Sequence, residues 1–344
     1  MDIMRILAKS APPHSDFLTA RQMSKRLNSV RSNSMRALET AQNYFFQTAL
    51  PRLEADLPGV MPVIAAGWSG RGSECWGFDD DISHDHDFAI GFALYLTREA
   101  EAEHGFALGR FYTRLLKEFP PEQFPASLSS KLGGSEHGVI IIEDFFERHL
   151  GFPGAPQSVE QWLYTPEYAL AEAVNGAIFL DNANVISRIR RAIAEDMPED
   201  VRLKKLAARA VSMAQSGQYN FMRCIKHNEP GAAMLYLSDF VRSGISMVFL
   251  LNRTFAPYSK WALRAMKSLL ILPELSGEFE HLLTGSEPPE QKAELVENIC
   301  AKIIGELKIQ QLSNLNDDYL EAHAFEIMKH IKSRRISSLH IMEG

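Results

Sequence analysis

The spacing of hydrophobic residues divides the chain into a mixed first part and a helical second part. Short apolar runs predict a strand over 60–70 that enters a glycine turn, a second over 85–96, and a third over 138–146 that leads into a turn or helix. From residue 158 to 340 almost every segment has helical spacing, including residues 161–180. This pattern predicts an α+β fold, in which a small mixed sheet is followed by an α-helical bundle.

Proline, glycine and capping residues indicate where these elements begin and end. The spacing over 33–57 predicts an amphipathic helix that is interrupted near Pro51, and Thr97 is a good N-cap for a helix that runs to about Lys117. The stretch 119–138 is rich in Pro, Gly and Ser, which predicts a loop. We expect three parts, namely a loosely attached leader (1–35), an α/β domain (36–155) and an α-helical domain (156–344).

Composition limits the classes of function. The 344 residues carry a formal net charge of −7, whereas a protein that binds nucleic acid over a broad surface is usually basic. A local basic pocket for one nucleotide stays compatible with this charge. The three cysteines are widely separated, which argues against a disulfide framework or a cysteine-rich zinc site. There is no cleavable leader with a long apolar core and no run of about 18 apolar residues, so we expect a soluble, cytoplasmic protein without a membrane segment.

The stretch GWSGRGSECWGFDDDISHDHDF (67–88) carries the candidate chemistry. Asp85 and Asp87 are two residues apart, so on a strand both side chains leave the same face. Two adjacent carboxylates repel each other, and a divalent cation between them is the usual reason for such a pair. The glycines upstream allow the backbone to close around phosphate oxygens. A phosphate cradle beside a carboxylate metal site is what phosphoryl or nucleotidyl transfer needs.

Three other interpretations of this stretch remain open. The acids at 79–81 fit a solvated turn. Alternating oxygen ligands from Asp79 onwards resemble a calcium loop, but the sixth position is His84 instead of Gly and the twelfth is Ile90 instead of Glu. A zinc site from residues 84–87 is a third reading, although alternate residues of one strand point to opposite faces.

Gly72-Ser73 followed by Asp85-x-Asp87 resembles the nucleotidyltransferase superfamily of polymerase-β-like fold. The surrounding sequence segments also resemble a bacterial nucleotidyltransferase-like family whose helical region is catalogued as a domain of unknown function. These segments are GSECWGFDDDISHDHDF, FFERHLG, KKLA, GQYN and LNRTFAPYSKW, and the resemblance covers roughly residues 60–275. In architecture the chain is also similar to aminoglycoside nucleotidyltransferases.

The resemblance implies roles for these residues. Asp85 and Asp87 would be catalytic and would bind Mg²⁺ or Mn²⁺, while Gly72 and Ser73 would cradle the β,γ-phosphates of an NTP, expected to be ATP. The family also places a third carboxylate on a neighbouring strand. In GVIIIEDFF the middle of the predicted strand is apolar, so either Glu143 or the next residue supplies this acid at the strand end, or it is missing.

An acidic protein needs local positive charge to hold a nucleoside triphosphate. The candidates are Arg71 between two glycines, Arg223 among aromatic neighbours, and Lys260 beside a tryptophan, with Lys204 and Lys205 as weaker ones. The competing interpretation of each is an ordinary solvated side chain.

Together these observations predict a metal-dependent nucleotidyltransferase. It would move a nucleoside monophosphate from an NTP to a hydroxyl of a small molecule or protein and release pyrophosphate, with an RNA end as the least expected acceptor. The alternative is a catalytically inactive nucleotide sensor or interaction protein on the same fold. The sequence indicates neither the acceptor nor the oligomeric state.

Overall fold

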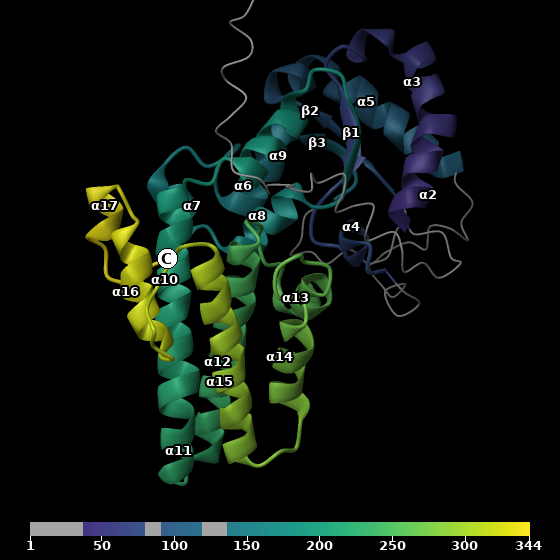
Figure 1. Ribbon diagram of the computed structural model, residues 1–344. Coiled ribbons are helices and arrows are strands. Elements are labelled where there is room, and N and C mark those ends of the chain that lie inside the picture. Colours follow the sequence, from purple (N-terminus) through teal and green to yellow (C-terminus); the bar gives the residue numbers. More distant parts are fainter. Residues whose placement is uncertain (1–36, 80–90, 119–135) are drawn as a thin grey trace, which may run out of the picture. The chain divides into compact units, whose positions relative to one another are not determined.

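The computed structural model describes residues 37–79, 91–118 and 136–344, which belong to one compact unit spanning residues 35–344. The fold is α+β, as predicted, with one small mixed sheet and many helices (Figure 1). Asp85 and Asp87 lie outside the described residues, as do the leader and most of the predicted loop that begins at residue 119.

Four short strands form the sheet, in the order β3-β2-β1-β4. Their bounds are Ala65–Trp68 (β1), Ala93–Leu96 (β2), Gly138–Ile141 (β3) and Ala177–Asp181 (β4). β1 pairs antiparallel with both β2 and β4, whereas β2 and β3 are parallel. β3 is therefore an edge strand whose first residue, Gly138, lies opposite Ala93.

The prediction of a helix throughout residues 161–180 was wrong at its end. Helix α8 (Glu167–Val174) stops at Asn175, and Gly176 has a φ of 66°, a left-handed conformation that favours glycine. The following residues Ala177–Asp181 include isoleucine and phenylalanine, and they pair with β1 as β4. The sheet thus takes one strand from the second half of the chain.

The first part of the unit contributes helices on either side of these strands. They are α2 (Ala37–Tyr44), η1 (Phe45–Ala49), α3 (Leu50–Asp56), η2 (Pro58–Val60), α4 (Ser73–Trp76), α5 (Arg98–Glu118) and α6 (Ile142–Leu150). Thr97 caps α5 as predicted, since its Oγ1 accepts a hydrogen bond from the Ala100 amide at 3.2 Å. The expected irregularity near Pro51 is the π-helical turn η1 directly before it. Phe45, Phe92 and Tyr112 form an edge-to-face aromatic core beneath the sheet.

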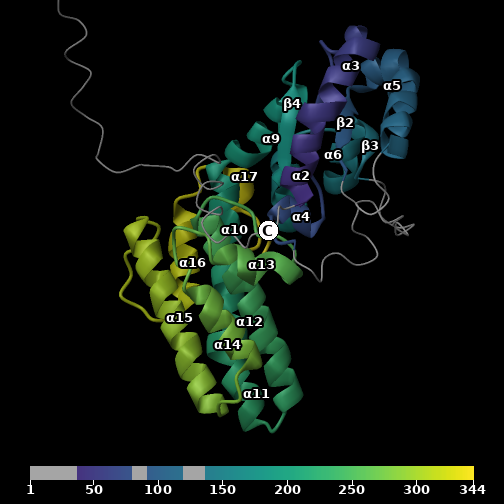
Figure 2. The same cartoon turned by 90° about the vertical axis from the view of Figure 1, so that its right-hand side faces the viewer.

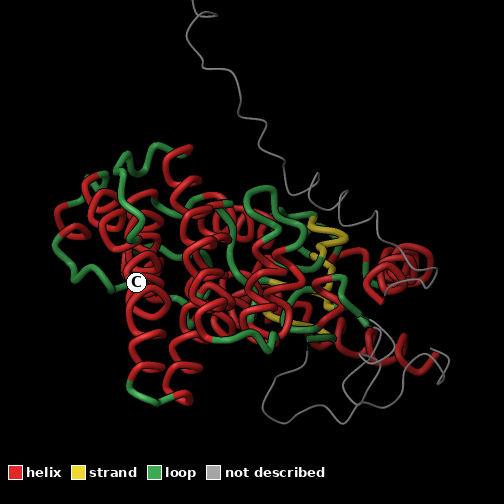
Figure 3. The backbone as a smooth tube through the Cα atoms, turned by 60° about the horizontal axis from the view of Figure 1, so that its bottom comes forward, coloured by secondary structure: helices red, strands yellow, loops and turns green. Residues whose placement is uncertain are grey.

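The second part is helical except for β4 (Figure 2). Its other helices are α7 (Val159–Tyr164), α9 (Val185–Glu195), α10 (Glu199–Met213), η3 (Ala214–Phe221), α11 (Met222–Lys226), α12 (Pro230–Leu251), α13 (Ser259–Met266), α14 (Leu275–Thr284), α15 (Pro289–Ile309), α16 (Leu320–Lys329) and α17 (Arg334–Ser337). The strands occupy only a small part of the described backbone (Figure 3).

Helix α12 is the central element of this helical part. Among the described helices it alone is long and apolar enough to cross a membrane, but half of its most apolar window is buried inside the protein. It packs against α10, η3 and α14. A Cβ on its Gly244 would lie 2.3 Å from the ring of Phe279, so the backbone of α12 and this ring are in close contact. These are the features of a core helix.

Candidate functional site

The turn after β1 forms as the glycines predict. Gly72 caps the short helix α4 with an extended ψ of 152°, and Ser73 begins that helix. The Ser73 hydroxyl donates to Oε2 of Glu74 at 3.1 Å. A Cβ on Gly72 would lie 2.0 Å from the Glu74 carboxylate, so this carboxylate lies directly against the turn. The backbone of Gly70–Ser73, hereafter the glycine turn, is therefore closely packed on one side.

Two residues that follow α8 hold the glycine turn from behind. The side-chain amide of Asn175 accepts a hydrogen bond from the Gly70 N–H at 3.0 Å and donates to the Gly70 carbonyl at 2.6 Å. The Ser69 hydroxyl donates to the Asn175 carbonyl at 2.8 Å. The Gly176 N–H donates to the Cys75 carbonyl at 2.9 Å. The sequence reasoning missed this contact, because partners 105 residues apart leave no local pattern.

Arg71 lies beside a buried carboxylate. Its Nε is 3.4 Å from Oε2 of Glu172, and 54% of the Arg71 side chain is exposed against 6% for Glu172. His149, whose side chain is fully buried, places Nδ1 3.5 Å from the same oxygen. Arg71 thus has one face on Glu172 while much of its guanidinium side chain stays accessible to a ligand.

Glu136 is a second carboxylate at the glycine turn, and the sequence reasoning missed it. A Cβ on Gly70 would lie 2.4 Å from Oε2 of Glu136, so the carboxylate touches the turn. This oxygen is buried and has no hydrogen-bond partner among the described residues. Burial raises the pKa of Glu136, and electrostatic interactions with His149 and Arg148 oppose that increase. A glutamate in a turn two residues before a strand carries no sequence signal that would distinguish it from a solvated one.

The carboxylate proposed from the sequence is engaged elsewhere. Glu143 lies in the first turn of α6, where its Oε2 accepts a hydrogen bond from the Arg98 amide at 3.0 Å. It therefore satisfies the first turn of α5. Its neighbour Asp144 forms an ion pair with the Arg98 side chain at 2.5 Å.

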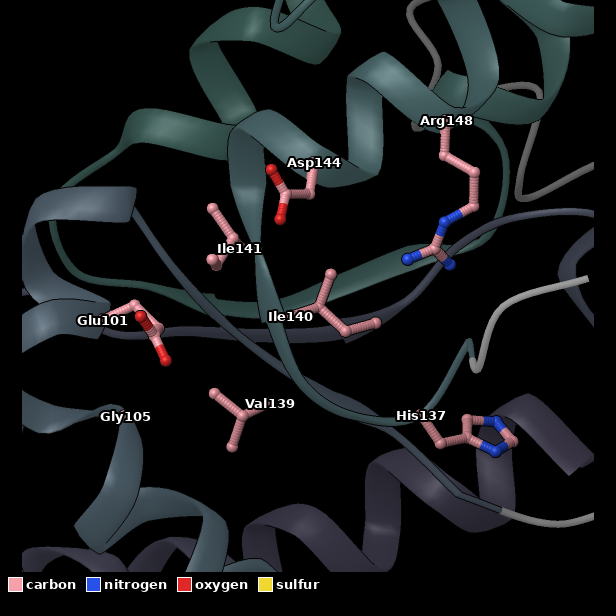
Figure 4. Close-up of a pocket in the computed structure, with 8 residues that line it drawn as sticks. All are labelled: Glu101, Gly105, His137, Val139, Ile140, Ile141, Asp144 and Arg148. Carbon is pink, nitrogen blue, oxygen red and sulfur yellow. The ribbon is translucent and has the colours of Figure 1, made fainter.

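A pocket of about 290 Å³ lies along edge strand β3 (Figure 4). Its lining residues are Glu101, Gly105, His137, Val139, Ile140, Ile141, Asp144 and Arg148. The carboxylates of Glu101 and Asp144 lie toward one end, and His137 lies at the other end, where it follows Glu136 in the chain. Burial lowers the pKa of His137 to about 4, so its ring is neutral at pH 7.

The start of helix α13 brings Lys260 to the same neighbourhood. Its Nζ lies 4.9 Å from the ring centroid of Trp261. Burial raises the pKa of Glu74, and the positive charge of Lys260 acts against this increase. Arg264 of the same helix donates to the Phe78 carbonyl at 3.1 Å, which ties α13 to the segment after α4. The structure thus brings α13, with Lys260 in its first turn, next to the segment after α4.

The other basic candidates lie elsewhere. Arg223 is exposed on α11, at the end of the long helices farthest from the sheet (Figures 1 and 2), and it donates to the Tyr219 hydroxyl at 2.7 Å. The partly buried guanidinium expected from its aromatic neighbours is not found. Lys204 and Lys205 are buried and donate to backbone carbonyls of the chain itself. Their ammonium groups are therefore used in contacts within the fold.

The described residues by themselves do not complete a metal centre. In the ranges 37–79, 91–118 and 136–344 no three His, Cys, Asp or Glu side chains are grouped so that they could hold a metal ion. The buried, unpartnered oxygen of Glu136 is nevertheless a suitable single ligand, because hard divalent cations prefer carboxylate oxygen. Asp85 and Asp87 lie outside these ranges, only a few residues before β2, the strand that pairs with both β1 and β3.

Comparisons with known proteins give two findings. Residues 162–262 match the model of a family described as a domain of unknown function (DUF4037), which confirms the expectation for the helical region. A nucleotidyltransferase-like protein from Exiguobacterium sibiricum is similar over 83% of this chain and 81% of its own, with 11% identity and a TM-score of 0.36. No curated protein matches the sequence.

Proposed function

We propose that this protein is a metal-dependent nucleotidyltransferase of the cytoplasm that transfers a nucleoside monophosphate from an NTP to a hydroxyl of a small molecule or a protein. One observation carries the proposal most strongly. The carboxylate of Glu136, whose Oε2 is buried without a hydrogen-bond partner among the described residues, touches the glycine turn directly upstream of Gly72-Ser73. Unsatisfied buried carboxylates are costly, and such groups are retained where a ligand binds them.

The residues of the chain would share the work of binding the triphosphate. Gly72 and Ser73 would receive the β,γ-phosphates. Arg71, half exposed beside Glu172, and Lys260 would supply the positive charge that an acidic protein needs at this place. Within the described part of the chain Lys260 forms no ion pair, which leaves its charge available.

Three acids would hold the cation. Asp85 and Asp87 would act together with Glu136, which takes the place of Glu143 in our proposal because Glu143 is bonded to the Arg98 amide. When bound, Mg²⁺ supplies positive charge that offsets the charge on the phosphate oxygens. The acids repel one another without a cation, so they would also favour its binding.

The proposed transfer needs only the NTP and the acceptor hydroxyl as reactants. A bond forms between the acceptor oxygen and the α-phosphorus, and the anhydride bond to the β-phosphate breaks with its electron pair leaving on pyrophosphate. The proton of the acceptor hydroxyl passes to a carboxylate of the site.

The test is incubation of the purified chain with Mg²⁺ and each of the four NTPs labelled at the α-phosphate, beside an Asp85→Asn/Asp87→Asn variant of unchanged thermal stability. Label transfer to the protein or to a panel of hydroxylated molecules, lost in the variant, is the expected result. Metal-dependent binding of an NTP without turnover on any acceptor would favour the sensor alternative. An absence of NTP binding would overturn both.

A further inference from the structure

The residue pair Asn175-Gly176 makes an unusual set of contacts with the turn between β1 and α4. Asn175 offers the Gly70 backbone one acceptor and one donor, at 3.0 and 2.6 Å, as a neighbouring strand would. Gly176 accompanies it with its bond to the Cys75 carbonyl. A Cβ on Gly176 would lie 2.1 Å from the Trp68 carbonyl, so only glycine allows this approach.

The pair is itself held in place. Nη2 of Arg190 donates to the carbonyls of Val174 and Asn175, each at 2.6 Å, at the carboxyl end of α8. β4 begins directly afterwards and pairs with β1. Asn175 is therefore fixed by the end of α8, by Arg190 and by the start of β4. Its side chain in turn holds the backbone of Gly70, which lies in no helix or strand.

From these contacts we infer that Asn175 is a positioning residue, which holds the glycine turn in the conformation that binds the phosphates of the nucleotide. The inference rests on the proposed function, and it gives a role to the region matched by the domain of unknown function, since Asn175 lies within residues 162–262. Through Asn175 that region would hold the backbone of the phosphate site, and through Glu172 it would hold Arg71.

The helical part of the chain offers a matched control. Asn252 uses its amide in the same way, since its Oδ1 accepts from the Leu270 and Ile271 amides and its Nδ2 donates to the Ile271 carbonyl at 2.9 Å. This second asparagine also joins two backbone segments, but it takes no part in the glycine turn. Asn175→Ala and Asn252→Ala therefore remove comparable hydrogen bonds from two different places.

The experiment measures three quantities on the full chain: thermal stability, affinity for MgATP, and amide hydrogen exchange over residues 69–73. We expect both variants to lose stability, and only Asn175→Ala to weaken MgATP binding, by about tenfold, and to speed exchange at the turn. Equal affinity in wild type and Asn175→Ala would overturn the inference, as would an equal loss in the two variants.

Two further readings keep the test decisive. If Asn175→Ala does not fold, amide hydrogen exchange in the wild type decides. The inference requires that the Gly70 amide is protected from exchange although it lies in a turn. Rapid exchange of this amide would overturn the inference. If wild type binds no NTP, the proposed function fails separately. The exchange difference at the turn then still shows whether Asn175 fixes its conformation.

Discussion

Two buried histidines show how differently the two regions of the molecule treat their polar groups. His323, in the helical bundle, bonds through both ring nitrogens, to the Ser313 hydroxyl at 2.7 Å and to the Asp317 carbonyl at 2.8 Å. His149, beside the glycine turn, has no hydrogen bond at either nitrogen within the described residues, and its Nδ1 only approaches Glu172 at 3.5 Å.

The same contrast extends to other side chains. Around the sheet, buried polar atoms without a hydrogen-bond partner occur on Trp76, Tyr95 and Glu136. In the bundle, Asn252 and the two buried lysines find backbone partners, while Trp261, Glu278 and Glu287 each carry one buried atom without a hydrogen-bond partner among the described residues. Because unsatisfied buried groups destabilise a fold, their larger number around the sheet and the glycine turn indicates a region shaped for a ligand. Four predictions test this distinction.

The largest effect is expected at Glu136. Glu136→Gln should lower the rate of nucleotidyl transfer by about 100- to 1,000-fold, the range in which removal of a catalytic charge or base acts. The thermal midpoint should hold or rise, because the substitution removes a negative charge whose Oε2 atom is buried without a hydrogen-bond partner among the described residues. Steady-state kinetics and calorimetry measure the two quantities.

The control is Glu143→Gln. Its amide oxygen can still accept the hydrogen bond of the Arg98 amide, so both rate and stability should stay close to wild type. A variant of Glu143 that loses activity while Glu136→Gln keeps it would reverse the assignment of the third acid.

Two of the basic residues singled out by the sequence, Lys260 and Arg223, should have different effects on nucleotide binding. Lys260→Ala should weaken MgATP binding by about tenfold, which corresponds to one charge-assisted contact. Arg223→Ala should leave the affinity unchanged, because Arg223 is exposed on α11 far from the sheet. Titration calorimetry decides, and an equal effect of both substitutions would contradict the location of the site.

A smaller effect is expected for the pair of Arg71 and Glu172. Arg71→Gln and Glu172→Gln should each weaken nucleotide binding by about two- to fivefold, since one partner is half exposed and such pairs couple weakly. The double variant should bind no worse than Arg71→Gln, because Glu172 acts only through Arg71. Multiplying losses in the double variant would show that Glu172 has an independent role.

The smallest effect on the site is expected from the bundle. Gly244→Ala should lower the free energy of unfolding by about 1–3 kcal/mol, because its Cβ meets the buried ring of Phe279 at 2.3 Å. Gly231→Ala, in open space at the start of the same helix, should be neutral or slightly stabilising. Neither substitution should change MgATP affinity; a weakened affinity in Gly244→Ala would link the bundle to the site.

The sequence predicted the parts of the fold that depend on local chemistry. The glycine turn, the cap at Thr97 and the apolar strand at Gly138 all follow from the preferences of neighbouring residues. β4 was missed because its five residues, read together with the helix before them, fit a helical period. The dipeptide Asn175-Gly176 was a turn signal that could have marked the boundary.

The candidate site was less predictable for a physical reason. Three of its residues, Glu136, Glu172 and Asn175, contact the glycine turn from positions about 65 to 105 residues away in the chain. Their burial arises only on folding, so no local pattern in the sequence indicates it. Lys260 was selected because an aromatic neighbour and a proline suggested a fixed side chain. The same reasoning selected Arg223, which the structure places on an exposed helix.

The most direct test is a crystal structure of the protein with Mn²⁺ and a non-hydrolysable NTP analogue, in which the anomalous signal locates the cation. We expect Mn²⁺ bound to Glu136 together with Asp85 and Asp87, and the phosphates against the glycine turn between Arg71 and Lys260. A cation that does not contact Glu136, or a nucleotide bound away from the glycine turn, would contradict this account.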